Sequence, residues 1–209
     1  MEYIYLHGFA SCPDSTKAQD IKKRFDKIST HIKIPDLNAG NFSELTISRQ
    51  INQVVSEFED QQSITLIGSS LGGLTSAHIA EKYEQVQKIV LLAPAFDFLS
   101  HWLPNLGDEN LQFWQKEKYL SVYHYREKRE LPLSYDFITD ALQYQESQLQ
   151  RPIPTLIIHG LKDEVIPIEA SQNYAVSRPW VELVELDSDH ALGNVFEDIW
   201  QAICLFCHL

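Results

Sequence analysis

Six short apolar runs rich in β-branched residues recur along the chain, and stretches with helical spacing separate them. The runs lie at 2–7, 31–34, 64–68, 88–93, 155–159 and 181–186. Several are apolar throughout, as in Ile-Val-Leu-Leu-Ala at 89–93, which is typical of strands covered on both faces. Parallel sheets are covered in this way, and the strand–helix alternation therefore predicts an α/β fold with a doubly wound, mostly parallel, six-stranded sheet.

The apolar spacing between these runs predicts the intervening helices. One pattern favours a helix over 15–28, whose start would carry a capping box from Thr16 to Gln19. A second pattern runs from 45 to 58 and a third from 71 to 83. With 209 residues, the chain is expected to form a single domain over 1–209.

About 60 residues, 95–154, separate the fourth run from the fifth, whereas a crossover between parallel strands needs only a dozen or more. Eleven of the 23 aromatic residues lie in this segment. Helices are expected near 109–124 and 135–147. Long insertions in compact domains are usually functional or disordered, and this one is too aromatic for disorder. We therefore expect a helical cap over a ligand site; the alternative is an enlarged crossover with its own small core.

A G-x-S-x-G motif, Gly68-Ser69-Ser70-Leu71-Gly72, joins the third apolar run to the helical pattern at 71–83. In this context the motif forms a strained strand-to-helix turn that lifts a serine above the sheet. The N-terminus of the following helix then favours developing negative charge. Ser70 is the predicted nucleophile. A phosphate-binding glycine turn and an ordinary tight turn are the alternatives.

A nucleophilic serine needs a base, and the base needs a carboxylate that orients it. In this kind of sheet the three residues follow the order serine, acid, histidine. Asp163 comes just after the fifth run and His190 just after the sixth, so both are expected at the sheet edge that carries Ser70. Asp97, after the fourth run, is the rival acid. Two aspartates close to the histidine are interpreted as loop-shaping residues, namely Asp187 and Asp189.

The tetrahedral intermediate of acyl transfer needs two preorganised N–H donors for its oxyanion. The backbone N–H of Leu71, directly after the serine, is the first candidate. The loop after the first run, His7-Gly-Phe-Ala, supplies the second, for which we choose Phe9. The alternative is that this loop is an ordinary exit from a strand.

Four motifs together, His7-Gly-Phe, Gly-Ser-Ser70-Leu-Gly-Gly, His-Gly-Leu-Lys-Asp163 and Asp-His190, resemble the α/β-hydrolase superfamily. The whole chain is similar to its small bacterial esterase branch, the YqiA-type hydrolases, in length and in opening directly on the strand before the oxyanion loop. The resemblance implies the strand order 2-1-3-4-5-6, a triad of Ser70, Asp163 and His190, and hydrolysis of carboxylic esters or thioesters without a cofactor. The 95–154 insertion is long for the smallest members, so no acyl-chain preference is implied.

Charge and composition limit the classes of partner that the protein is expected to bind. The formal net charge is −12, which disfavours nucleic acid and anionic membranes because both attract cationic surfaces. No apolar run approaches the ~18 residues that span a bilayer, the first residues lack the basic stretch of a secretory signal, and three cysteines are too few for a disulfide framework. We expect a cytoplasmic enzyme that acts on a small-molecule ester. The eight histidines lack metal-ligand spacing, so no metal is expected.

Two weaker patterns favour structural interpretations. Cys204-Leu-Phe-Cys207-His208 spells a haem attachment motif, but it lies at the end of a helical pattern, which favours structural cysteines. A local basic cluster is interleaved with glutamates, which favours a solvated helix face over a phosphate or coenzyme A site. That cluster consists of Lys116, Lys118, Arg126, Lys128 and Arg129.

The aromatic residues of the insertion are the candidate lining of an acyl pocket. The four chosen are Phe96, Phe98, Trp102 and Trp114. Such a pocket would favour acyl chains of about four to eight carbons over acetyl, because each buried methylene contributes about 0.8 kcal/mol. Three other functions stay open: an acyltransferase or thioesterase on the same triad, a non-catalytic ligand-binding protein of this fold, and a cofactor-free C–C hydrolase or haloperoxidase.

Overall fold

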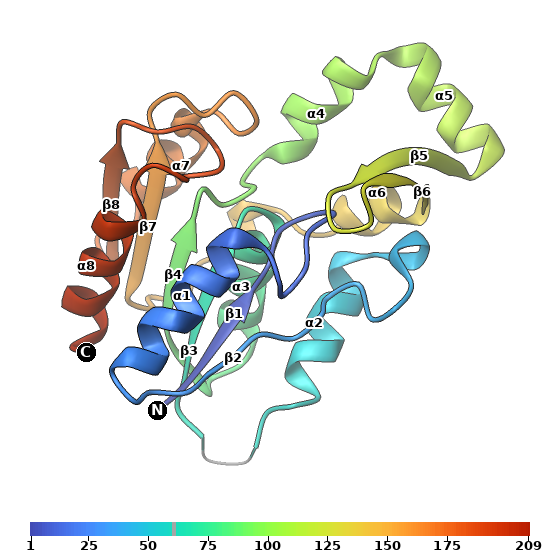
Figure 1. The fold of residues 1–209 in the computed structure, drawn as a ribbon. Coiled ribbons are helices and arrows are strands. Elements are labelled where there is room, and N and C mark those ends of the chain that lie inside the picture. Colours follow the sequence, from blue (N-terminus) through green and yellow to red (C-terminus); the bar gives the residue numbers. More distant parts are fainter. Residues whose placement is uncertain (60–61) are drawn as a thin grey trace.

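The computed structural model describes residues 1–59 and 62–209. Its centre is a six-stranded parallel sheet with helices on both faces (Figure 1). The strands are β1 (Glu2–Leu6), β2 (Ile32–Lys33), β3 (Ile64–Ser69), β4 (Val86–Leu92), β7 (Thr155–Gly160) and β8 (Val181–Leu186). Their spatial order is β2-β1-β3-β4-β7-β8, and every neighbouring pair is parallel. The predicted fold class and strand order are therefore confirmed.

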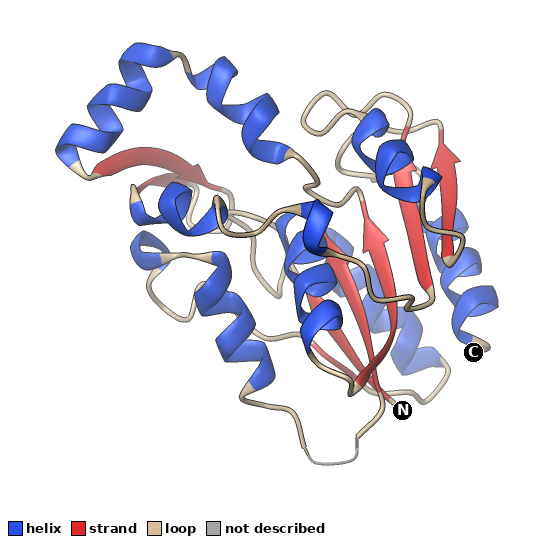
Figure 2. Cartoon of the chain, turned by 180° about the vertical axis from the view of Figure 1, so that it is seen from behind, coloured by secondary structure: helices blue, strands red, loops and turns tan. Residues whose placement is uncertain are grey.

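Alternate residues of each central strand face opposite helical layers. In β4, Ile89 and Leu91 belong to the core on one face, whereas Val90 and Leu92 belong to the core on the other. The first core lies under α2 (Ile47–Val55), α3 (Leu71–Lys82) and α7 (Ile168–Val176), and the second lies under α1 (Thr16–Lys27) and α8 (Phe196–Cys207). The view from behind in Figure 2 shows the sheet between these layers. Burial on both faces explains the continuous apolar runs of the sequence.

The start of α1 differs from the prediction. The helix begins at Thr16 with Ser15 as its N-cap residue, and the Ser15 side chain makes no capping hydrogen bond. The Gln19 side chain instead donates to the carbonyl oxygen of Pro13 at 3.0 Å. The predicted capping box is therefore wrong, because the glutamine amide is bound to the preceding loop.

The insertion is not purely helical. It contains α4 (Phe98–Leu106), α5 (Asp108–Glu117), an antiparallel pair of β5 (Tyr119–His124) with β6 (Arg129–Ser134), α6 (Asp136–Ala141) and a 3-10 turn, η2 (Glu146–Gln148). The helix expected at 109–124 ends at Glu117, where Lys118 adopts a left-handed conformation with φ 70°. The residues after it alternate in exposure with a period of two, as in a strand. The helix expected at 135–147 ends at Ala141. A helical cap was thus the wrong description of a mixed segment.

A backbone hydrogen bond and two ion pairs join the β5–β6 hairpin to the loops that follow β1 and β2. The backbone N–H of Tyr125, at the hairpin turn, donates to the carbonyl oxygen of Ala10 at 3.2 Å. Next to it, Arg126 reaches Asp36 at 3.5 Å and Asp14 at 3.7 Å. A second 3-10 turn, η1 (Phe42–Glu44), packs against β6. In Figure 1 the hairpin consequently lies close to the chain that follows β1.

Trp114 of α5 is the buried centre of the insertion. It is fully inaccessible to solvent, its Nε1–H donates to the carbonyl oxygen of Leu133 at 2.9 Å, and its ring packs on Trp102 and Tyr135. Trp114→Ala should lower the free energy of unfolding by roughly 3–5 kcal/mol, the usual cost of emptying a buried aromatic site.

Chemical denaturation of Trp114→Ala and of Phe113→Ala makes the comparison, since Phe113 precedes Trp114 on α5 and is 56% exposed. The control should cost less than about 1 kcal/mol. Equal costs for the two variants would contradict a core centred on Trp114.

Three absences concern residues 1–59 and 62–209 only. No helix there is long and apolar enough to cross a membrane. No group of three or more His, Cys, Asp or Glu side chains there could hold a metal ion. The three cysteines form no disulfide bond there, with Cys12 buried and Cys204 and Cys207 half-buried on and near the last turns of α8.

Candidate active site

Ser70 occupies a sharp turn between β3 and α3. Its backbone has φ 52° and ψ −118°, a conformation that costs a non-glycine residue on the order of 1–3 kcal/mol. Glycine is required on both sides of the turn. A Cβ at Gly68 would lie 2.3 Å from the carbonyl oxygen of Gly72, and a Cβ at Gly72 would lie 2.2 Å from that of Leu6. The Ser70 carbonyl oxygen accepts N–H groups of α3 and of Ala95, which holds the turn in place.

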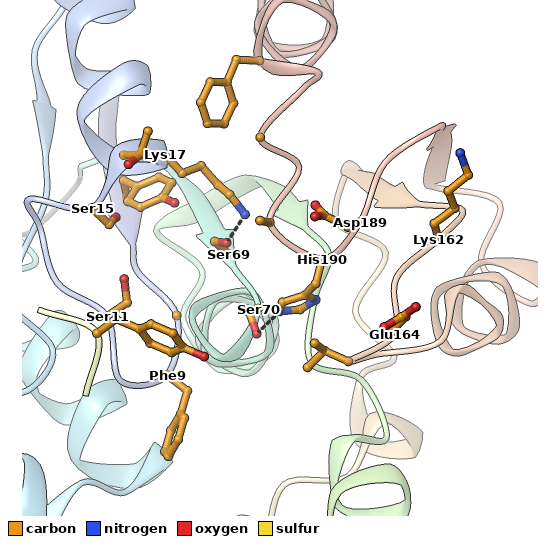
Figure 3. Close-up of a pocket in the computed structure, with 18 residues that line it drawn as sticks. Phe9, Ser11, Ser15, Lys17, Ser69, Ser70, Lys162, Glu164, Asp189 and His190 are labelled. Atoms are coloured by element: carbon orange, nitrogen blue, oxygen red, sulfur yellow. Dashed lines mark hydrogen bonds between the residues drawn. The ribbon is translucent and has the colours of Figure 1, made fainter. Parts of the chain in front are cut away.

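His190 connects Ser70 to Asp163. Its Nε2 lies 3.0 Å from Ser70 Oγ, and its Nδ1 lies 2.7 Å from Asp163 Oδ2. Figure 3 shows the imidazole beside the serine hydroxyl. Because the carboxylate accepts the Nδ1 proton, Nε2 is left to accept the proton of the serine hydroxyl. The structure thus brings together the three side chains that the sequence selected, each from the loop after a different strand.

The side chain of Asp163 is inaccessible to solvent and fully hydrogen-bonded. Its Oδ1 accepts the backbone N–H groups of Val165 and Ile166 at 2.9 and 2.8 Å, and its Oδ2 lies 3.1 Å from His159 Nε2 as well as beside His190. Burial by itself raises the pKa of Asp163, but the hydrogen bonds from His159 and His190 outweigh it and hold this pKa well below its usual range. The Asp163 carboxylate is therefore ionised at neutral pH.

His159 is a site residue that the sequence analysis did not single out. It lies on β7, four residues before Asp163, and is completely buried. Its Nδ1 lies 2.8 Å from Ser171 Oγ, and its Nε2 lies 2.9 Å from the carbonyl oxygen of Ile166. Since Nε2 faces two acceptors, it carries the ring proton. His159 thereby fixes the orientation of the acid. A histidine at the end of an apolar strand, four residues before an acid, is the signal that could have found it.

The other aspartates lie apart from His190. The side chain of Asp97 is 60% exposed and faces Ser100 and His101 on its own helix, α4. Asp187 pairs with Lys162, and Asp189 Oδ1 accepts the backbone N–H of Leu192 at 3.1 Å. No hydrogen bond or ion pair joins any of the three to His190 in the described part of the chain. The geometry accordingly favours Asp163 over Asp97.

The loop after β1 runs directly against the serine turn. A Cβ at Gly8 would lie 3.3 Å from both the carbonyl oxygen of Ser69 and the Cβ of Ser70. Buried His7 anchors this loop, with Nδ1 3.0 Å from the Gly8 carbonyl oxygen and Nε2 accepting the N–H of Leu37 at 3.0 Å. Burial lowers the pKa of His7, so the ring is neutral, as these two bonds require.

The N–H groups of Phe9 and Leu71 are available as donors. Neither has a hydrogen-bond acceptor among residues 1–59 and 62–209. Leu71 is the first residue of α3, where helical N–H groups lack partners within the helix. Phe9 follows Gly8, which packs on Ser70. Their joint role as an oxyanion hole remains a prediction that this arrangement accommodates.

Two cavities meet at Ser70. The larger, about 1010 Å³, contains His190 and a polar wall that includes Ser11, Ser15 and Lys17 (Figure 3). The smaller, about 310 Å³, is lined mainly by apolar side chains, among them Phe9, Phe98, Trp102, Phe137 and Val165. The serine hydroxyl therefore lies between a wide cavity with several charged and hydroxyl side chains on its wall and a smaller, mainly apolar one.

The four aromatic residues expected to line the acyl site divide into two pairs. Phe98 and Trp102 line the smaller cavity beside Ser70. Phe96 is buried and stacks on Tyr174 with ring centroids 4.3 Å apart. Trp114 is the buried centre of the insertion described above. The expectation is wrong for Phe96 and Trp114, because both rings are used up in packing between elements.

The parallel sheet in this strand order, with a serine turn after β3 and the histidine after the last strand, defines the class: the chain has the α/β-hydrolase fold. The family model described as "Uncharacterised protein family (UPF0227)" matches residues 2–207. The chain belongs to this family, and the resemblance to YqiA-type hydrolases is confirmed.

Relatives with curated names and solved structures agree with this class. The chain is 29% identical over 220 residues to the Mus musculus protein named palmitoyl-protein thioesterase ABHD10, mitochondrial, covering 96% of this chain and 72% of that protein. The structure of alpha/beta hydrolase domain-containing protein 10 from mouse matches with a TM-score of 0.80 at 24% identity, over 99% of this chain and 88% of that one. Est1E from Butyrivibrio proteoclasticus with bound ferulic acid matches with a TM-score of 0.81 at 19% identity, over 98% and 87%. At these identities the structures establish the fold alone.

Proposed function

We propose that the protein is a serine esterase that cleaves carboxylic esters, and thioesters, of small to medium acyl groups through an acyl-enzyme. The observation that carries this proposal is the chain of contacts from Ser70 Oγ through His190 to the ionised carboxylate of Asp163. A neutral imidazole held by a buried carboxylate is the arrangement that makes a serine hydroxyl nucleophilic.

The reaction follows from the direction of these contacts. His190 Nε2 takes the proton of Ser70 as Oγ attacks the acyl carbonyl, and the carboxylate of Asp163 stabilises the resulting imidazolium. The N–H groups of Phe9 and Leu71 hold the oxyanion. The imidazolium then protonates the departing alcohol or thiol. Water, activated by the same histidine, attacks the acyl-serine and releases the acid.

The two cavities support a proposal for where the two halves of the substrate bind. The leaving group has to lie within reach of His190, and His190 lines the larger cavity but not the smaller one. The acyl chain therefore occupies the smaller apolar cavity, against Phe98 and Trp102. A relative named as a thioesterase and a neighbour in the fold that binds ferulic acid support acyl substrates.

A fluorophosphonate probe followed by peptide mapping tests the proposal. The serine oxygen attacks the phosphorus of the probe, fluoride leaves, and the serine becomes phosphonylated. The label should therefore be found on Ser70 of the folded protein and should appear together with loss of p-nitrophenyl butanoate hydrolysis. A folded protein that neither reacts with the probe nor hydrolyses this ester would overturn the proposal and leave a non-catalytic ligand-binding role.

The length of the preferred acyl chain tests the apolar cavity. With p-nitrophenyl esters, kcat/KM should rise from two to about eight carbons by roughly fourfold for each methylene that is buried. Trp102→Ala should flatten this rise, since its ring lines the cavity.

Phe113→Ala, an exposed aromatic of the same insertion, should keep the slope of the parent. A series that is flat from two to eight carbons in the parent enzyme would mean that the insertion forms no acyl pocket.

Hydrolysis and acyl transfer on the same triad differ only in the molecule that accepts the acyl group. Water as acceptor gives an esterase or thioesterase, and an alcohol gives an acyltransferase. Supplying alcohols with p-nitrophenyl butanoate and measuring both butanoate and the new ester separates them. We expect butanoate as the main product, because the larger cavity has a volume of about 1010 Å³ and carries charged and hydroxyl side chains on its wall, and so admits water.

A further inference from the structure

Lys17, the second residue of α1, presents a charged side chain to the larger cavity. It is half-buried, and its Nζ donates to Ser69 Oγ at 3.0 Å, on the residue directly before the nucleophile (Figure 3). An ammonium group has three N–H donors. Within the described parts of the chain, Ser69 is its one hydrogen-bond partner and no carboxylate lies within ion-pairing distance. Lys17 therefore keeps donors that the protein itself does not use.

Charged groups surround this ammonium without contacting it. Burial lowers the pKa of Lys17 to about 8, while the carboxylates of Asp163 and Asp189 oppose this effect. Asp163 is bound by its histidines, and one oxygen of Asp189 accepts the N–H of Leu192. Lys17 is thus protonated at neutral pH and incompletely paired.

The other titratable groups on the wall of the larger cavity make no hydrogen bond or ion pair with Lys17 in the described part of the chain. Glu164 and Lys162 come from the loop after β7, and Lys162 pairs with Asp187. His190 is bound to Asp163 and Ser70. Burial raises the pKa of Tyr5, which therefore stays neutral. None of these groups occupies the free donors of Lys17.

The position of Lys17 relates it to one half of the substrate. It lines the same cavity as His190 and is absent from the lining of the apolar cavity. Because the leaving group lies on the side of His190, Lys17 faces the leaving group and not the acyl chain. The hydroxyl groups of Ser11 and Ser15 line the same wall, and the Ser15 hydroxyl makes no capping hydrogen bond to α1.

We propose that Lys17 is a specificity-determining residue that binds a negatively charged oxygen group, a carboxylate or a phosphate, on the leaving group of the ester. The inference rests on the proposed esterase function and narrows its substrate class to acyl esters of anionic alcohols, phenols or thiols. Hydrogen bonds between charged partners are stronger than those to neutral groups, so an anion there gains more from Lys17 than a neutral group does.

Two esters of equal size test this. The butanoyl esters of 3-hydroxybenzoate and 3-hydroxybenzamide share an acyl group and differ in one charge. The ratio of their kcat/KM values should favour the carboxylate about tenfold in the parent enzyme, equivalent to about 1.4 kcal/mol. In Lys17→Met the ratio should fall to near one, and Lys17→Arg should keep a ratio of several-fold.

Three controls isolate the effect. Lys23→Met removes an exposed charge from the same helix and should keep the parent ratio, which excludes an effect of net charge. The butanoyl ester of 3-hydroxyphenyl phosphate separates phosphate from carboxylate as the preferred anion. Moving the carboxylate to the acyl side, in p-nitrophenyl succinate against p-nitrophenyl butanoate, should bring no preference for the charged ester. A preference for the succinate ester would overturn the assignment of Lys17 to the leaving group.

The pH dependence of this ratio is a second test. Lys17 carries its charge below a pKa of about 8 and loses it above, so the tenfold preference should be present at pH 7 and fall toward one by about pH 9.5. The benzoate carboxylate stays charged throughout. In Lys17→Met the ratio should not change with pH.

Each remaining outcome is decisive. If the parent hydrolyses both esters at equal rates, or if Lys17→Met lowers both equally, Lys17 has a structural role and the inference fails while the esterase function stands. If the folded parent hydrolyses p-nitrophenyl butanoate but neither of these two esters, the inference alone fails. If it hydrolyses none of the three esters and does not react with the fluorophosphonate probe, the proposed function fails and the inference fails with it.

Discussion

Replacing Ser70 with alanine should lower kcat for p-nitrophenyl butanoate by a factor of about 10³ or more, because no other group can form the acyl-enzyme. The fold should survive, since alanine fits the space of serine and bears the same backbone strain at φ 52°. The residual rate, set by the oxyanion donors and by binding alone, should not depend on the acyl-enzyme.

Steady-state kinetics and thermal unfolding of Ser70→Ala make the measurement. The matched control is Ser69→Ala, on the neighbouring hydroxyl that accepts from Lys17. Ser69→Ala should still take up the fluorophosphonate label, and Ser70→Ala should not. Labelling of Ser69 in the parent enzyme, with Ser70 unmodified, would place the nucleophile one residue earlier and contradict the site described here.

The second large effect is expected from Asp163→Asn. The carboxylate of Asp163 accepts four N–H groups, two from histidines and two from the backbone. An amide has one acceptor oxygen, so its NH₂ group would face an N–H donor of His159 or His190. His190 would then take the wrong tautomer, and kcat should fall by about 10³–10⁴.

Asp97→Asn supplies the control, because Asp97 is an exposed acid at the start of α4. It should stay within about threefold of the parent, since surface substitutions of this kind change little. Circular dichroism of both variants shows whether Asp163→Asn is folded when its rate is measured. If Asp97→Asn lost more activity than Asp163→Asn, the acid would belong after the fourth strand.

Local sequence signals predicted the sheet and the placement of the candidate triad. Strands buried on both faces produce continuous apolar runs, and a turn that excludes a methyl group at Gly68 and Gly72 requires glycine. Both signals can be recognised in short windows of the sequence, although the atoms that crowd Gly72 belong to Leu6 and His7 at the end of β1. Because the carboxyl ends of parallel strands meet at one edge, the strand order alone brought Ser70, Asp163 and His190 together.

The insertion was harder to predict because its signals conflict. Tyr119 and Tyr123 are four residues apart, which fits a helix, whereas the alternation along 119–124 fits a strand, and pairing with 129–134 decides for the strand. Likewise, aromatic residues in a sequence indicate which side chains will be buried, but they do not indicate which residues those side chains will contact. Lys17 could not be selected, because only the packed position of α1 turns it toward Ser69.

The link between Tyr125 and Ala10 bears on how substrates arrive at Ser70. The hairpin turn is joined to the chain that carries Phe9, and Arg126 reinforces the joint through two aspartates. Because the hairpin turn is held by these contacts, we expect the insertion to stay in place and not to open and close when substrate binds. If the proposed esterase function holds, we expect small esters to reach Ser70 through the larger cavity, so hydrolysis of dissolved esters should not increase in the presence of an oil–water interface.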